Sequence, residues 1–492
     1  MPESLKAKTL QGAIWTLLER LGTQVVGFAV TIVLARLLTP SDYGVIGMIA
    51  VFMSISQMFI DCGFGSALIR KKDRTDEDFS TVFWFNLAVS IICYGVLFFA
   101  APFIARYYHM PILTGILRVI GVNLIIYALY TVQVTRFTAE VNFKPQAKVA
   151  VSSCILSGAV GIALAYLGFG PWALVGQQIF AAVFSGSLYW TFSKWHPDLV
   201  FSFPAFKELF GFSSRIVAAG FLHTIYANVS PIIIGRKYTA ADLGFYSRAE
   251  GLVLLPEGIF QGTLGRVIFP VLSSIQNDEM RLRAAYNKYL RLMTSIVAAS
   301  MLLLAACAEP LVVILIGEKW LPCAPYLQLL ALGVMVDPMI RVNLNVLYVK
   351  GRSDVVLKLE IIKKIIAISI VVTAVQYGVL WLCVGRIIYA YIALVLNLHY
   401  CGPFIGMSFW RQMREVAPIY LAAFFAAGLA YILAHLGHTG AFIESVFLRN
   451  FAALAVAGCA GAVSYLGLAW MLKFDLITEG LALLAKIRSR MK

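Results

Sequence analysis

Apolar residues in this chain fall into long uninterrupted blocks that short polar connections separate. Most blocks hold about 20 to 28 residues, the length at which an α-helix crosses a bilayer. Barrel strands would alternate apolar and polar positions, which these blocks do not do. The pattern predicts an all-α polytopic membrane protein with about fourteen transmembrane helices. The blocks span residues 11–38, 43–69, 80–105, 112–137, 147–168, 171–193, 209–235, 243–273, 290–316, 325–349, 355–377, 378–400, 414–437 and 447–472.

An internal repeat relates two parts of this pattern. The stretch from Arg36 to Gly44, RLLTPSDYG, is matched 200 positions later by Arg236 to Gly244, RKYTAADLG. Each stretch closes one apolar block and opens the next, and Pro102 and Pro310 occupy matching places in later blocks. The repeat therefore aligns spans one to six with spans seven to twelve. Because six is even, the two copies enter the membrane from the same side and are parallel repeats, an arrangement typical of transporters with a substrate site between the copies.

This repeat divides the chain into four predicted regions. Residues 1–205 form an N-terminal lobe of six helices, and residues 206–410 form a C-terminal lobe of six more. Residues 411–473 add two further helices. Residues 474–492 interleave apolar and basic positions, which predicts either an amphipathic helix on the inner membrane surface or a frayed polar tail.

Composition supports the membrane assignment and explains the charge. The 492 residues are 60% hydrophobic and only 13% charged, whereas soluble proteins carry about 25% charged residues. The net charge of +15 would suggest nucleic acid in a soluble protein, but Lys and Arg concentrate in the connections on one side. This bias predicts a multi-pass protein with both termini in the cytoplasm. The positive charge then faces anionic lipid headgroups, and no nucleic-acid partner is expected.

Other features argue against catalysis within the chain. The eight cysteines are scattered without metal-type spacing or a disulfide framework, so no metal site is expected. No phosphate-binding GxxxxGK[ST] loop occurs, and no connection is long enough for a soluble domain. We expect no catalytic residue and no cofactor.

Polar side chains inside the first two spans are the first candidate site residues. Glu19, Arg20 and Gln24 lie in the first span, and Gln57 and Asp61 lie in the second. They belong to stripes of polar and small residues at helical spacing, which has two interpretations of equal weight. The stripes face a polar cavity, or they pack helices tightly with Arg20 and Asp61 as an ion pair.

The seventh, eighth and tenth spans add further ionisable groups. In the eighth, Glu250, Glu257 and Gln261 share one face; Glu257 near the middle should be paired, protonated or bound to a cation. The remaining groups are Arg215 and His223 in the seventh span, Arg248 and Arg266 in the eighth, and Asp337 and Arg341 in the tenth. His223 fits a packed residue better than a proton relay, and the spacing of Asp337 and Arg341 indicates a structural ion pair.

The residue types suggest a division of roles. Guanidinium groups bind phosphate through a fork of donors, and membrane carboxylates suit coupling to Na⁺ or H⁺. We therefore assign Arg20, Arg215, Arg248 and Arg266 to an anionic substrate. We assign Asp61, Glu250 and Glu257 to ion coupling. Glu19, Gln24, Gln57, His223 and Gln261 are expected to line the cavity.

Five motifs in order resemble a known family. They are ARLLTPSDYGV at 35–45, GFGPWALVGQQ at 168–178, LGFYSRAEGLVLLP at 243–256, FPVLSSIQND at 269–278 and IGEKWLPCAPYLQLLAL at 316–332. Across roughly residues 5–410 the chain resembles the Wzx-type polysaccharide flippases of the multidrug/oligosaccharidyl-lipid/polysaccharide (MOP) superfamily. The resemblance implies two MATE-like lobes of six helices around a V-shaped cavity, and rocking between inward- and outward-open states.

The resemblance also implies a substrate and a setting. The substrate would be an oligosaccharide repeat unit on undecaprenyl pyrophosphate, flipped across the bacterial inner membrane, with polysaccharide polymerase and export machinery as partners. The related lipid II flippase uses arginines on its first, second and eighth helices. Arg20 matches the first, and Arg248 or Arg266 matches the eighth. The second span departs from the pattern because it offers Asp61 and no arginine.

Other functions remain open at this point. An ion-coupled multidrug exporter of the same superfamily would share the repeat but would favour an acidic cavity with fewer arginines. A membrane polysaccharide polymerase or ligase would need catalytic groups on a substantial external loop, and the external connections here are short. A structural scaffold for polysaccharide assembly would leave the buried charges unexplained.

Overall fold

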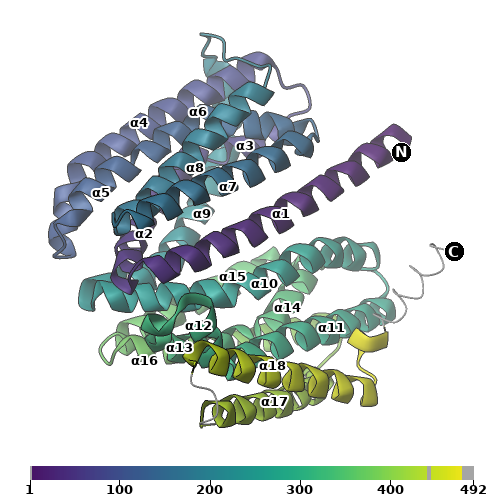
Figure 1. Cartoon of the computed structure of the whole chain (residues 1–492). Helices are drawn as coiled ribbons and strands as arrows, with labels where there is room; N and C mark the ends of the chain where they lie inside the picture. The colour runs from purple at the N-terminus through teal and green to yellow at the C-terminus, as the bar shows by residue number, and fades with distance from the viewer. Residues whose placement is uncertain (1–2, 440–444, 479–492) are drawn as a thin grey trace. The chain divides into compact units, whose positions relative to one another are not determined.

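The computed structural model describes residues 3–439 and 445–478, which are almost entirely helical and contain no strand (Figure 1). The first helices are α1 (Glu3–Leu37), α2 (Pro40–Asp61), α3 (Phe64–Arg70), α4 (Asp76–Tyr107), α5 (Ile112–Ile120), α6 (Val122–Ala139), α7 (Phe143–Tyr166), α8 (Pro171–Phe192) and α9 (Phe203–Lys237). They are followed by α10 (Ala240–Ser274), α11 (Glu279–Ala306), α12 (Ala308–Ile316), the 3₁₀ helix η1 (Glu318–Cys323), α13 (Ala324–Val334), α14 (Asp337–Val349), α15 (Ser353–Ala374), α16 (Val379–Ile405), α17 (Phe409–Thr439) and α18 (Val446–Met471).

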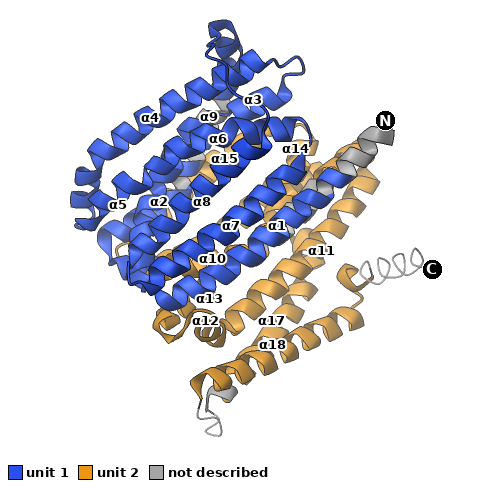
Figure 2. Cartoon of the chain, turned by 45° about the horizontal axis from the view of Figure 1, so that its top comes forward, with its two compact units in different colours: residues 1–244 blue, residues 245–492 orange. Residues whose placement is uncertain are grey.

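The chain divides into two compact units, residues 1–244 and 245–492 (Figure 2). In the first unit α7 packs on α1 and α8, α6 packs on α4 and α8, and α9 packs along α2. In the second unit α17 packs on α11 and α18, while α16 contacts α13, α14 and α15. Contacts therefore place α9 in the first unit, although the sequence repeat assigns it to the second copy. The boundary between repeats at residues 205 and 206 remains a prediction.

Each predicted apolar block corresponds to one helix or to a broken pair. The block 43–69 breaks between α2 and α3, where Cys62 and Gly63 adopt left-handed φ angles of 40° and 70°. The block 325–349 breaks before Asp337, because Pro338 is not tolerated inside a helix and instead lies in the first turn of α14. Hydrophobic periodicity does not reveal such breaks, since both halves remain apolar.

Ten stretches of the described residues are long and apolar enough to cross a membrane. They establish a multi-pass membrane protein by length and composition. The helices α8, α9, α10 and α15 correspond to predicted spans but are not among the ten. The count of fourteen therefore remains a prediction. Of the predicted amphipathic tail, the part from residue 479 onward lies outside the described residues.

The two repeated stretches form the same helix start. Thr39 is the N-cap of α2: its backbone N–H and hydroxyl donate to the Asp42 carboxylate at 2.8 and 2.7 Å, and the Asp42 N–H donates back to the hydroxyl. Thr239 and Asp242 repeat this exchange at the start of α10, with distances of 3.1 and 2.7 Å. The Thr-x-x-Asp spacing is a capping box, which satisfies N–H groups that a helix start leaves without partners.

The glycine that ends each stretch allows the two helix starts to touch. A Cβ atom on Gly44 would overlap the backbone carbonyl of Ala240. A Cβ atom on Gly244 would lie 2.8 Å from the carbonyl carbon of Pro40 and 3.3 Å from the Gly44 nitrogen. Both contacts lie within the first unit and are reciprocal, since 40 pairs with 244 and 44 pairs with 240. Only glycine permits backbones to approach this closely.

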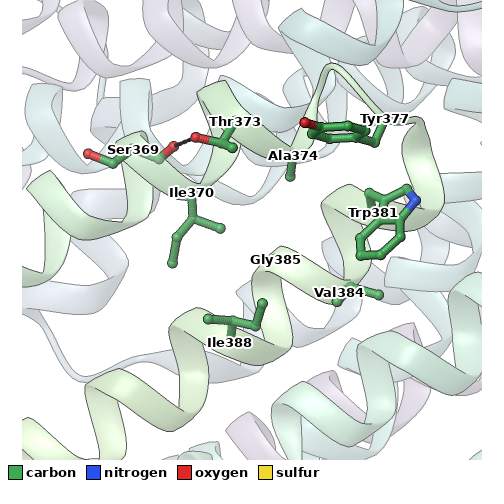
Figure 3. A pocket seen from close by; sticks show the side chains of 9 residues that line it. All are labelled: Ser369, Ile370, Thr373, Ala374, Tyr377, Trp381, Val384, Gly385 and Ile388. Atoms are coloured by element: carbon green, nitrogen blue, oxygen red, sulfur yellow. Dashed lines mark hydrogen bonds between the residues drawn. The ribbon is translucent and has the colours of Figure 1, made fainter.

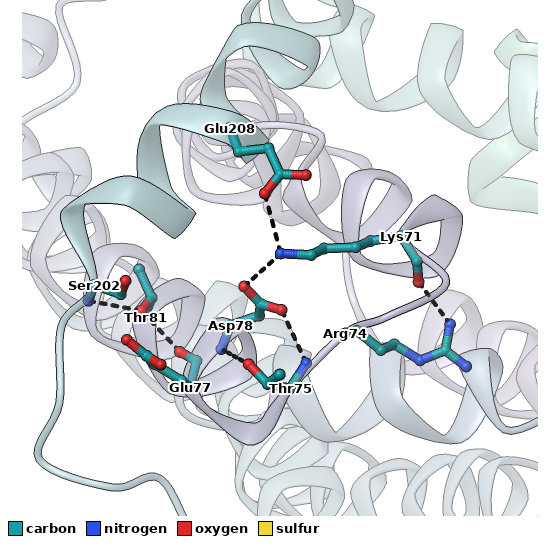
Figure 4. A network of polar contacts seen from close by, with 8 residues as sticks. All are labelled: Lys71, Arg74, Thr75, Glu77, Asp78, Thr81, Ser202 and Glu208. Carbon is teal, nitrogen blue, oxygen red and sulfur yellow. Dashed lines mark hydrogen bonds and ion pairs between the residues drawn. The ribbon is translucent and has the colours of Figure 1, made fainter.

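A polar cluster holds the segment between α8 and α9 against the start of α4 (Figure 4). Lys71 binds Asp78 at 3.0 Å and Glu208 of α9 at 3.1 Å. The backbone N–H groups of Asp198 and Ser202 donate to the hydroxyls of Ser80 and Thr81, each at 3.0 Å. These bonds tie the connection between the two repeat copies to one end of the helix bundle.

Lys71 remains charged in this cluster. Burial alone would lower its pKa, but the hydrogen bonds and attraction from Asp78 and Glu208 outweigh burial and raise the pKa above the ordinary value of 10.5. A raised lysine pKa contributes stability at every pH below that ordinary value. Lys71 therefore keeps its charge throughout the physiological range.

Replacing Gly44 with alanine should destabilise the first unit. The added Cβ overlaps the Ala240 carbonyl, and overpacking of this kind costs about 1–3 kcal/mol. We expect a lower thermal unfolding midpoint for the purified protein in detergent. Gly95→Ala in α4 is the control, because its Cβ meets no atom within 4 Å and alanine favours the helix. Equal midpoints for Gly44→Ala and wild type would show that the crossing is not tight.

Candidate functional site

A carboxylate and a phenol meet in the first unit at the C-terminal end of α2. The Tyr127 hydroxyl of α6 donates a hydrogen bond of 2.8 Å to Oδ1 of Asp61. Asp61 retains exposed surface, and a carboxylate exposed to hydrocarbon would be costly. One turn earlier, the amide nitrogen of Gln57 is buried and has no hydrogen-bond partner among the described residues. A buried donor beside an open carboxylate fits a site that binds water, an ion or a polar ligand.

Tyrosines extend this site from α6 to α8. Tyr127 and Tyr130 have ring centroids 5.4 Å apart, and Tyr130 stacks on Tyr189 at 5.5 Å with 14° between the ring planes. Asp61 interacts electrostatically with Tyr130, and Glu19 of α1 does so with Tyr189. The row of rings thus has a carboxylate at each end, one from α2 and one from α1.

The helix α1 is held against α7 by small residues. A Cβ on Gly22 would lie 2.8 Å from Val151, and Gly27 faces Cys154. Arg20 and Gln24 are exposed in the described structure, whereas Glu19 is half-buried. Gly22 and Gly27 therefore lie on the face of α1 that packs against α7, while the choice between the packing and the cavity interpretation of the stripe stays open. The proposed Arg20–Asp61 ion pair does not occur among the described contacts, in which Asp61 binds Tyr127.

In the second unit, Glu250 has a specific partner. The Arg386 guanidinium of α16 forms an ion pair with the Glu250 carboxylate of α10 and donates to the Tyr246 hydroxyl at 3.2 Å. Arg386 is 37% exposed and Glu250 28% exposed. A carboxylate that holds a guanidinium is occupied by that cation, so Glu250 is a poorer candidate than Asp61 for binding a transported ion.

The other sequence candidates are placed less fully. Arg248 is half-buried in α10, near Cys323 of η1. Asp337 and Arg341 lie in the first two turns of α14, and Asp337 interacts electrostatically with Tyr420; their mutual ion pair remains a prediction. The side chains of five candidates lie outside the described residues: Arg215, His223, Glu257, Gln261 and Arg266.

Sequence reasoning missed the tyrosines and one buried lysine. Tyr127, Tyr130 and Tyr189 sit in apolar blocks where aromatic residues are common, so their spacing carries no signal. Lys363 of α15 did offer one, because it is a charge in an apolar block. Its side chain is only 5% exposed and pairs with Glu360 one turn earlier. Such a group is a functional candidate by default.

Solved structures of low sequence identity share this fold. The lipid II flippase MurJ superposes with a TM-score of 0.72 at 15% identity, covering 95% of this chain and all of that chain. A multidrug resistance MATE transporter of the MOP superfamily superposes with a TM-score of 0.60 at 16% identity, covering 78% of this chain and 96% of that one. This chain therefore has the fold of these two transporters.

Sequence comparisons identify the family. The family model described as polysaccharide biosynthesis protein matches residues 33–325, so the chain belongs to that family. It is 26% identical to the teichuronic acid biosynthesis protein TuaB of Bacillus subtilis, over 71% of this chain and 73% of the relative. It is 28% identical to the succinoglycan biosynthesis transport protein ExoT of Rhizobium meliloti, over 68% of each. The lipopolysaccharide biosynthesis protein WzxC of Escherichia coli is 22% identical, over 85% of this chain and 86% of that protein.

Breaking the Arg386–Glu250 pair should destabilise the second unit. Arg386→Met leaves Glu250 without its charged partner, and loss of a hydrogen bond to a charged group costs about 1.5–3 kcal/mol. We expect Arg386→Met and Glu250→Gln each to lower the thermal unfolding midpoint, and the double variant to lower it by less than the sum. Additive effects would mean that the two groups do not interact. Arg352→Met is the control, because its partner Asp354 is exposed and surface pairs contribute little.

Proposed function

We propose that this protein is a secondary transporter that flips a lipid-linked oligosaccharide repeat unit across the bacterial inner membrane. The carrier would be undecaprenyl pyrophosphate, and both termini would lie in the cytoplasm. The observation that carries the proposal is membership in the polysaccharide biosynthesis family together with the transporter fold. An amphiphile with a bulky sugar head requires a polar route for the head while its tail stays in lipid.

The charged residues support an anionic head. Arg20 on α1 is exposed and Arg248 on α10 is half-buried. The helix α1 contains one of the membrane-crossing stretches, and α10 corresponds to the eighth predicted span. A guanidinium in such a position recognises pyrophosphate through paired hydrogen bonds. We assign Arg20 and Arg248 to the pyrophosphate. We keep Arg215 and Arg266 as further candidates, with Gln24 as a donor to the sugars.

The Asp61–Tyr127 pair supports ion coupling. Asp61 is open on one side and bonded to a phenol on the other, so it can exchange a proton or accept Na⁺ without losing its position. The buried amide of Gln57 lies on the same helix face, four residues earlier. We assign Asp61 as the principal coupling group, with Tyr127 as its positioning residue. Glu257 is a second candidate, and Glu250 contributes through Arg386.

Removing the pyrophosphate ligands should block export. We expect Arg20→Ala and Arg248→Ala to reduce export about tenfold or more, because a hydrogen bond between charged groups is worth about 1.5–3 kcal/mol. The measurement is polysaccharide output in cells that lack the native gene, with lipid extraction to locate the carrier-linked repeat units. Those units should accumulate on the cytoplasmic leaflet while the variant protein still inserts. Arg106→Ala, in the exposed last turn of α4, is the control and should retain output.

Two results would contradict this assignment. Full output from both arginine variants would remove them from substrate binding. If deletion of the gene changes drug sensitivity and leaves no trapped carrier-linked units, the multidrug exporter is favoured instead.

Neutralising Asp61 should uncouple transport from the ion gradient. In proteoliposomes with an imposed Na⁺ or H⁺ gradient, we expect Asp61→Asn to abolish the gradient response, since an amide cannot take up a cation by charge. Tyr127→Phe should weaken the response because it removes the hydrogen bond that positions Asp61. Tyr130→Phe is the matched control, since the ring stack does not need its hydroxyl. An Asp61→Asn response equal to wild type would place coupling elsewhere, with Glu257 tested next.

A further inference from the structure

A groove lies between the C-terminal end of α15 and the first half of α16 in the second unit (Figure 3). The two helices are consecutive and are joined by the short turn at residues 375–378. The cavity has a volume of about 480 Å³. Its lining residues are Ser369, Ile370, Thr373, Ala374, Tyr377, Trp381, Val384, Gly385 and Ile388. None of these belongs to the candidate site described above.

Small residues create the floor of the groove. Gly385 is buried, and a Cβ there would lie 2.7 Å from Ile370 and 3.4 Å from Ala374. A larger residue at position 385 would fill the space between the helices. Ile370 and Ile388 form the walls, as Figure 3 shows. Tyr377 and Trp381 stand at the end next to the turn, with ring centroids 6.2 Å apart.

The groove offers almost no polar partner to an occupant. The Ser369 hydroxyl donates to the Ile365 carbonyl at 3.0 Å, and the Thr373 hydroxyl donates to the Ser369 carbonyl at 2.9 Å. Both hydroxyls that α15 contributes to the lining are therefore engaged within that helix, and the other polar groups of the lining belong to the Tyr377 and Trp381 rings beside the turn. A polar group that entered the groove would lose its hydrogen bonds to water without replacement. Hydrocarbon alone suits this interior.

The surroundings place the groove in the hydrocarbon region of the bilayer. The helix α16 is one of the membrane-crossing stretches. Exposed apolar side chains continue beyond the groove on both helices, including Ile365, Val372 and Val395. Tyr377 and Trp381 beside the turn match the aromatic residues that mark the level of lipid headgroups. Lipid chains are thus the molecules available to fill the space.

We propose that this groove binds one acyl chain of a phospholipid from the leaflet adjoining the turn at residues 375–378. The length of the groove favours an acyl chain over a polyprenyl chain. From Trp381 to Ile388 the helix rises about 11 Å at 1.5 Å per residue, which is less than half of the roughly 30 Å hydrocarbon thickness. An acyl chain of one leaflet matches this depth, whereas a polyprenyl chain is much longer. Phospholipids also greatly outnumber carrier lipids, which favours their binding by mass action.

The position of the chain gives it a structural role. Gly385 faces the groove, and its neighbour Arg386 extends to Glu250 and Tyr246 of α10. A bound acyl chain therefore supports the segment of α16 that presents Arg386. Emptying the groove leaves a void beside that segment and removes the packing contacts of its lining. The lipid should accordingly stabilise the second unit.

The test fills the groove with a side chain. Ile388→Trp places a ring at the wall of the groove from a position that is 49% exposed. Val395→Trp is the matched control, because Val395 lies two turns further on the same face of α16 and is also 49% exposed. The full-length proteins are purified in mild detergent, and bound phospholipid is counted by native mass spectrometry. Thermal unfolding is then followed with and without added phosphatidylethanolamine.

We expect wild type and Val395→Trp to retain one more phospholipid than Ile388→Trp. Added phosphatidylethanolamine should raise the unfolding midpoint of wild type and Val395→Trp, and should leave Ile388→Trp unchanged. Ile388→Ala widens the groove and should retain the lipid, which separates occupancy from general damage at position 388. Equal retention by Ile388→Trp and wild type would overturn the proposal. So would a polyprenyl lipid as the retained molecule, or a second protein copy that covers the groove without lipid.

Discussion

The contact on which the first unit depends is the reciprocal crossing of two helix starts at Gly44 and Gly244. Each start is closed by a Thr–Asp capping box, so its backbone N–H groups are satisfied before the helices meet. Each glycine then lets the other backbone approach without a Cβ between them. The helix α9, which directly precedes α10, lies along α2, with Gly235 against Met48 and Phe221 against Phe59. One repeated nine-residue pattern thus sets both the helix starts and their contact.

Three charged side chains inside the helical units are each held by a partner that defines their orientation. Asp61 accepts from Tyr127, Glu250 holds Arg386, and Lys363 pairs with Glu360. These partners differ in chemistry, and the difference separates their roles. A phenol leaves the carboxylate charge of Asp61 available, whereas a guanidinium compensates the charge of Glu250. Transport chemistry therefore concentrates at Asp61 in our proposal, and Glu250 serves the positioning of α16.

Apolar and polar contacts hold different parts of the chain. Apolar side chains on α15 and α16 are exposed, and the groove between the helices follows from the small residues Ala374 and Gly385. At the other extreme, the Lys71 cluster binds the connection between the two repeat copies through charges and hydroxyls. Apolar packing in the membrane and polar bonding at its edge thus hold different parts of the same chain.

The amino-acid sequence by itself determined the helical class, the approximate extent of each apolar block and the internal repeat. These features depend on local hydrophobicity and spacing, which survive in any arrangement of the helices. The sequence also revealed Asp61 and Glu250 as costly membrane charges, but not their partners. Tyr127 and Arg386 lie 66 and 136 residues away in the chain, and only packing brings them close. The same holds for Gly44 and Ala240. The repeated pattern predicted two similar helix starts, but only the tertiary structure decided that they touch. Close backbone contact depends on how whole helices cross.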